Sequence, residues 1–141
     1  MTRIDFHSNV PDKDLYACRL VRKAYLARNR VVLLASDAEH RARLDAALWR
    51  LSDVDFLPHV AADDALAGRT PILLIDSDTP DLPHYDILIN LTQRTPADVD
   101  RYQRVFEIIS QDEQDAAAGR QRYASYKRAE HTLTHFVAGQ A

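Results

Sequence analysis

Apolar residues are distributed along the chain in a pattern typical of strands that alternate with helices. Nearly continuous apolar runs at residues 30–35, 71–76 and 86–91 predict interior strands, because a parallel strand that is covered on both faces has apolar side chains on both. A shorter alternation of apolar and polar residues at 2–6 predicts a first strand. The chain is therefore expected to build a sheet whose centre is buried.

Between these strands, apolar residues recur at steps of three and four, which predicts amphipathic helices. The first helix is expected at about residues 12–28. A second begins after Ser36, which forms a capping box with Glu39. Trp49 lies off the apolar stripe of this second helix, so its side chain is expected to be exposed.

The C-terminal third of the chain is expected to be mostly helical. Thr95 and Pro96 resemble an N-cap and a first helical residue. The apolar stripe of the helix that would follow consists of Val99, Tyr102, Phe106 and Ile109. A last helix is predicted from about Asp112 to beyond Tyr126, followed by a tail after Thr132.

The alternation of strands and helices predicts an α/β fold, a three-layer α/β/α sandwich with a mainly parallel sheet of about five strands. With 141 residues, the chain is expected to form a single domain, 1–141. Its three glycines are Gly68, Gly119 and Gly139, and none lies between a predicted strand and the helix that follows it. The fold is thus expected to be Rossmann-like without a nucleotide site.

Composition narrows the classes of function. The net charge is -3, which gives no overall attraction to phosphate, so nucleic acid is expected to be reached only indirectly, through partners. No apolar stretch approaches the roughly 20 residues of a membrane helix, and no signal peptide is evident, so we expect no membrane contact and a cytoplasmic location. The one cysteine, Cys18, is expected to be a small buried apolar residue.

An enzymatic alternative depends on carboxylates at strand ends. Asp5, Asp37 and the acidic residues at 76–78 would gather around a magnesium ion in a phosphate-transferring or hydrolytic enzyme. A simpler interpretation is that Asp37 favours a helix N-terminus and that residues 76–78 form an exposed turn. His131 and His135 lie four residues apart without a third ligand nearby, which favours surface positions over a zinc site. No cofactor or metal is expected.

The last predicted helix shows a separation of charge. Acidic residues occupy its start, whereas no acidic residue occurs between Gly119 and Ala129. The residues that stack on one face are Ala116, Arg120, Tyr123 and Lys127. Two cations beside a tyrosine would suit an anionic peptide. The alternative is a favourable placement of cations near a helix C-terminus, and the pattern alone leaves both open.

Four segments together resemble the chi subunit family of bacterial DNA polymerase III: residues 44–49, 56–59, 86–91 and 120–127. Their order and spacing carry the resemblance, which extends over nearly the whole chain. It implies a non-catalytic adaptor that pairs with the psi subunit of the clamp loader. It also implies binding to the acidic C-terminal tail of single-stranded-DNA-binding protein, a tail that ends in an apolar residue with a free carboxylate.

The resemblance also implies which residues hold that tail: Arg120, Tyr123, Ile109 and Lys127. Ala124 departs from the family pattern, and so does Ala116, because relatives carry lysine at these positions. The pocket would therefore contain fewer cations. Arg122 or Arg128 would compensate only by reaching around the helix.

For the surface that binds psi, the resemblance implies Trp49, Phe56 and Pro58. Aromatic residues are common anchors at protein interfaces. A helicase is a further partner implied for the same surface, as an alternative to psi. Ordinary core packing is the competing interpretation, chiefly for Phe56.

Overall fold

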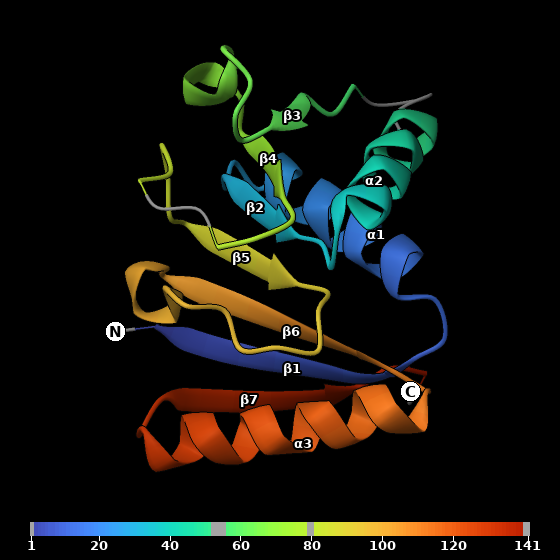
Figure 1. Cartoon of the computed structure of the whole chain (residues 1–141), viewed down its shortest axis with the longest axis vertical. Helices are drawn as coiled ribbons and strands as arrows, with labels where there is room; N and C mark the ends of the chain where they lie inside the picture. Colours follow the sequence, from blue (N-terminus) through green and yellow to red (C-terminus); the bar gives the residue numbers. More distant parts are fainter. Residues whose placement is uncertain (1, 52–55, 79–80, 140–141) are drawn as a thin grey trace.

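The computed structural model describes residues 2–51, 56–78 and 81–139 (Figure 1). Within these ranges the strands are β1 (Arg3–Val10), β2 (Val31–Leu34), β3 (His59–Ala61), β4 (Ile72–Ile75), β5 (Ile87–Asn90), β6 (Arg104–Ser110) and β7 (Thr132–Val137). The helices are α1 (Lys13–Leu26), α2 (Ala38–Leu51) and α3 (Glu113–Arg128), with 3-10 turns η1 (Ala67–Arg69) and η2 (Val99–Arg101). In the part described, no helix combines the length and the apolar character needed to span a bilayer.

The strands form one sheet in the order β3-β4-β2-β5-β6-β1-β7, and every neighbouring pair is parallel. Helices α1 and α2 pack on one face, where Val21 and Leu44 belong to one buried apolar cluster. Helix α3 packs on the other face, where Tyr126 joins a second cluster with Ile4. The predicted α/β fold, with helices on both faces of a parallel sheet, is confirmed (Figure 1).

Side-chain caps fix where the first two helices begin. The Asp12 carboxylate accepts a hydrogen bond from the Leu15 backbone N–H at 3.1 Å, as an N-cap residue does. For α2 the cap is Asp37, which accepts from the His40 backbone N–H at 2.8 Å. The predicted capping box of Ser36 and Glu39 is wrong. The Ser36 backbone N–H instead donates to the His40 ring.

The expected helix after Thr95 and Pro96 is wrong. Only η2 is helical there, and β6 follows as an interior strand between β5 and β1. The spacing of three and four was a coincidence within a nearly continuous apolar run, because the five residues from Val105 to Ile109 are all buried. A strand with both faces covered has no period that distinguishes it from a helix.

The tail after Thr132 is also a strand, β7, which pairs with β1 over the full six residues. With β6 and β7, the sheet has seven strands in the described ranges rather than about five. Strand β7 lies at the sheet edge, and most of its side chains are exposed. Its apolar signal is therefore weak, since only one side of it packs against the protein.

Candidate functional site

A hollow of about 470 Å³ lies beside α3 where the helix crosses β1 and β6; we call it the α3 pocket. Its lining consists of Phe6, Ser8, Ile109, Ala116, Gly119, Arg120, Tyr123 and His135. Three of the four residues expected to hold a tail thus line one hollow, although they come from two elements. Lys127, the fourth, is exposed on the same helix but is not part of the lining.

The floor of the α3 pocket is apolar and depends on a glycine. A Cβ atom on Gly119 would lie 2.7 Å from Cδ1 of Ile109, so the absence of a side chain lets Ile109 fill the space between β6 and α3. The Tyr123 ring packs edge-on against Phe6, with centroids 5.1 Å apart. Sequence reasoning did not identify Gly119 or Phe6; Phe6 was recognisable only as an apolar position of the first strand.

Arg120 supplies an exposed cation at the rim of this pocket. Its side chain is 67% exposed and its Nη2 lies 3.2 Å from Oε1 of Glu113, which is itself exposed. An ion pair in solvent contributes little to stability, typically about 0 to 1 kcal/mol. The guanidinium can therefore exchange Glu113 for an incoming carboxylate at little cost.

Arg122 points into the protein and cannot add a cation to the α3 pocket. Its Nε lies 3.1 Å from Oε1 of Glu107 and its Nη1 donates to the Gln93 carbonyl at 2.9 Å. Glu107 also accepts from the Tyr126 hydroxyl at 2.7 Å and from Asn90 at 2.9 Å. Burial raises the pKa of Tyr126, so the hydroxyl keeps its proton and donates.

The two alanines at which the family resemblance implies lysine occupy different places. Ala116 is partly buried and lines the α3 pocket. Ala124 and Arg128 are exposed on α3 and lie outside the lining. Within the described lining, Arg120 is thus the one permanently charged side chain.

A second surface, the Trp49 patch, consists of Trp49, Phe56 and Pro58. The rings of Trp49 and Phe56 lie 5.9 Å apart, and the two residues are 50% and 64% exposed. Pro58 is partly buried. Core packing is therefore not the role of these two aromatic side chains, and the exposure expected of Trp49 is confirmed.

The buried His59 ring supports the Trp49 patch from below. Its Nδ1 donates to the Leu57 carbonyl at 2.6 Å, and its Nε2 lies 3.2 Å from Oδ1 of Asp45. The Trp49 ring packs against it at 4.8 Å between centroids. The indole is consequently held in place although half of it faces solvent.

The carboxylates of the enzymatic alternative do not come together. Asp5 pairs with arginines on the sheet, Asp37 caps α2, and Asp76 pairs with Arg41 at 3.3 Å. Asp78 is 3.1 Å from an arginine of another loop. Among residues 2–51, 56–78 and 81–139, no group of three or more His, Cys, Asp or Glu side chains could hold a metal ion.

The two histidines of the last segment have separate partners. His131 lies 2.7 Å from Asp100, and His135 lies 2.7 Å from the Ser8 hydroxyl. They do not face a common ligand. His135 is exposed, as expected, whereas the side chain of His131 is only 14% exposed.

Comparison with known proteins gives a consistent result. The chain matches the family model described as DNA polymerase III chi subunit, HolC, over residues 1–134. It is 34% identical to DNA polymerase III subunit chi of Pseudomonas aeruginosa over 132 residues, covering 90% of each chain. It is 24% identical to the same subunit of Escherichia coli over 110 residues, covering 78% of this chain and 75% of the relative. The chain therefore belongs to the DNA polymerase III chi subunit family, whose members are accessory subunits in DNA replication.

Proposed function

We propose that this chi-family chain is a non-catalytic cytoplasmic adaptor that joins two proteins of the replication machinery. The α3 pocket binds the acidic C-terminal tail of single-stranded-DNA-binding protein, and the Trp49 patch binds the psi subunit of the clamp loader. The observation that carries the proposal is the α3 pocket itself, an apolar hollow with one exposed arginine at its rim.

The chemistry of the α3 pocket suits a chain end of that kind. An apolar last side chain can be buried against Ile109 and the ring of Tyr123. The free carboxylate can then accept two parallel hydrogen bonds from the Arg120 guanidinium, a geometry in which charged hydrogen bonds are strongest. Lys127 lies outside the lining, so it contributes long-range attraction to the acidic residues that precede the chain end.

The Trp49 patch has the properties of an interface centre. Two adjacent aromatic rings remain exposed, and aromatic anchors of this type carry much of the binding energy in protein complexes. A helicase would use the same surface, so psi and a helicase exclude each other.

The two surfaces lie far apart on the sheet. Pro58 directly precedes β3, one edge strand, whereas the α3 pocket includes His135 of β7, the opposite edge strand (Figure 1). One adaptor can therefore hold a tail and psi at the same time.

The tail site is tested by calorimetric titration with a synthetic tail peptide. Arg120→Glu should abolish measurable binding, because one charged hydrogen bond contributes about 1.5–3 kcal/mol and the new charge repels the peptide. Arg128→Glu is the matched control, since Arg128 is exposed on the same helix outside the pocket. Equal affinities for the two variants would refute the assignment.

The psi site is tested by co-purification of co-expressed chains. Trp49→Ala should reduce recovery of psi strongly, since hot-spot residues contribute about 2 kcal/mol or more. Leu66→Ala is the control, because Leu66 is an exposed apolar residue away from the patch. If psi is recovered equally with both variants, the patch is not its docking site.

A further inference from the structure

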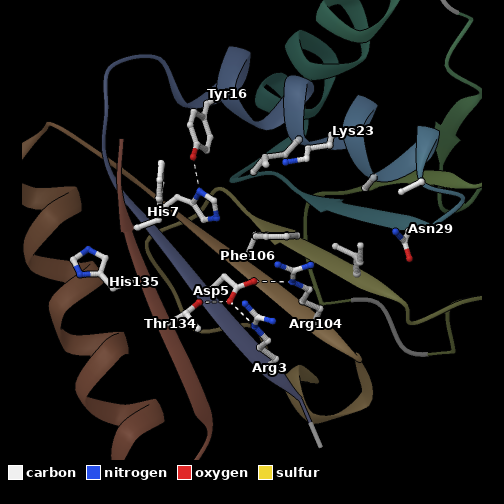
Figure 2. Close-up of a pocket in the computed structure, with 15 residues that line it drawn as sticks. Arg3, Asp5, His7, Tyr16, Lys23, Asn29, Arg104, Phe106, Thr134 and His135 are labelled. Atoms are coloured by element: carbon white, nitrogen blue, oxygen red, sulfur yellow. Dashed lines mark hydrogen bonds and ion pairs between the residues drawn. The ribbon is translucent and has the colours of Figure 1, made fainter. Parts of the chain in front are cut away.

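A second hollow, of about 510 Å³, lies on the face of β1 opposite to the α3 pocket, between the sheet and α1; we call it the α1 hollow. Figure 2 shows its charged lining: Arg3 and Arg104 project from the sheet, and Lys23 lies across from them on α1. None of these residues belongs to the two surfaces described above. The α1 hollow therefore needs its own explanation.

The two arginines are held together by a buried carboxylate. Oδ1 of Asp5 accepts from Nε of Arg3 at 3.0 Å, and Oδ2 accepts from Nε of Arg104 at 2.6 Å. The sheet register places Arg3 directly opposite Arg104. Each guanidinium uses only Nε on Asp5, which leaves its two terminal nitrogens able to bind a further acceptor.

Asp5 stays ionised in this arrangement. Burial raises its pKa, but hydrogen bonds from Thr134 and Arg104 outweigh that effect, so the pKa is lower than that of an ordinary aspartate. The carboxylate thus fixes two arginines side by side before any ligand arrives. Such a pair matches the oxygens of a phosphate group.

The α1 hollow carries an excess of positive charge although the protein is acidic overall. Its lining contains three cations and one carboxylate. Lys23 is exposed and has no carboxylate partner among the described residues. Burial lowers the pKa of His7, so that ring is neutral at pH 7 and adds no charge. The preferred ligand is therefore an anion.

An exposed aromatic ring completes the lining. Phe136 on β7 is 52% exposed, and its ring lies 5.5 Å from that of His7. Because β7 is an edge strand, the α1 hollow is bordered by an open side of the sheet. A planar base can stack on an exposed ring of this kind, whatever the identity of the base. Phe136 lies four residues along β7 from the position that pairs with Arg3, so a phosphate of a neighbouring nucleotide would reach the cations.

We propose that the α1 hollow binds single-stranded nucleic acid, with a phosphate on Arg3 and Arg104 and a base on Phe136. The expectation of purely indirect contact with nucleic acid followed from the net charge of -3. The net charge does not reveal the local cluster of cations in the α1 hollow. Strand β7 also supplies an exposed aromatic side chain, Phe136. An acidic peptide would satisfy the arginines but offers no planar group to Phe136.

The test is fluorescence anisotropy of a labelled oligothymidylate at low salt. Wild type should bind, with affinity that falls as salt rises; for single strands each neutralised phosphate contributes about 0.7 to the slope of log K against log salt. Lys23→Glu should weaken binding about tenfold or more, because a repulsive charge replaces a cation. Arg69→Ala, an exposed arginine on η1, is the control and should bind as wild type does.

Replacing both Arg3 and Arg104 with alanine should lower the salt slope by about 0.7, because the one phosphate that the pair binds is no longer neutralised. Circular dichroism checks that the variant is folded. Phe136→Ala should lose about tenfold in affinity, and Phe136→Tyr should retain binding. Arg120→Glu should leave oligonucleotide binding unchanged, which separates this proposal from tail binding. No binding at low salt, equal losses in Arg69→Ala and Lys23→Glu, or displacement by oligoglutamate as efficient as by unlabelled oligonucleotide would overturn it.

Discussion

The two sides of α3 use the same residue type in opposite ways. Arg120 and Arg122 are two positions apart, yet one side chain is 67% exposed and the other 3%. Arg122 completes a buried network around Glu107, whereas Arg120 has only an exposed partner at the rim of a hollow.

This difference separates stability from recognition. A buried ion pair cannot lose one member without leaving an uncompensated charge in the core. An exposed pair can exchange its partner with little loss, because water already screens it. The inner side of α3 should therefore determine whether the domain folds, and the outer side should determine what it binds.

The largest effect is expected from Glu107→Ala on the inner side. The substitution leaves Arg122 buried without its carboxylate, and removal of one partner of a buried pair costs about 3–5 kcal/mol. Urea denaturation monitored by circular dichroism measures the loss. A change below about 1 kcal/mol would show that the network is not the anchor of α3.

Asp115, also on the inner side of α3, should make the stability of the domain depend on pH. Burial raises the pKa of Asp115. The hydrogen bond from the Ser110 backbone N–H and the nearby Lys13 ammonium lower it by more than burial raises it, so the net shift is downward. A carboxylate whose pKa is lowered in the folded state stabilises the fold at pH values above its unfolded pKa of 3.8. This stabilisation is lost as the pH falls through the folded pKa.

Asp115→Asn should therefore destabilise the protein by about 1.5–3 kcal/mol at pH 7. The difference from wild type should shrink when both are measured at pH 3. Urea titrations at the two pH values give the comparison. If wild type and variant differ by the same free energy of unfolding at both pH values, the charge of Asp115 does not contribute to stability.

On the outer side, Arg120→Ala should alter binding without altering the fold. The free energy of unfolding should change by less than about 1 kcal/mol, since the Glu113 pair is exposed. Tail-peptide affinity should fall about 10- to 100-fold, as expected for a charged hydrogen bond. Calorimetry and urea denaturation of the same sample test both halves, and a large loss of stability would contradict the distinction between the two sides.

The smallest effect is expected from adding a cation next to the pocket. Ala124→Lys should raise tail affinity only a few-fold, because Ala124 is exposed outside the lining and a surface ion pair contributes about 0.2–1 kcal/mol. The gain should disappear in 1 M salt. Ala129→Lys, beyond the end of α3, is the control.

The sequence predicted much of this fold and part of the site. Apolar runs identified β2, β4 and β5, because buried parallel strands are apolar on both faces. The same property concealed β6, whose apolar residues also fit a helical spacing. Strand β7 was not foreseen because an edge strand buries only part of its surface.

Within the site, helical spacing correctly placed Arg120 and Tyr123 on one side of α3. It did not reveal that Arg122 is buried, because that depends on Glu107, fifteen positions away on another element. The contribution of Gly119 was equally hidden, since it follows from the distance between a helix and a strand.

The central claim is that Arg120 and the α3 pocket bind the free carboxylate at the end of an acidic chain. Calorimetry with two tail peptides, identical except that one ends in a carboxamide, tests it most directly. Wild type should prefer the free acid about tenfold or more, and Arg120→Ala should bind both peptides with equal, weak affinity. Equal affinity of wild type for the two peptides, or a preference that persists in Arg120→Ala, would contradict the claim.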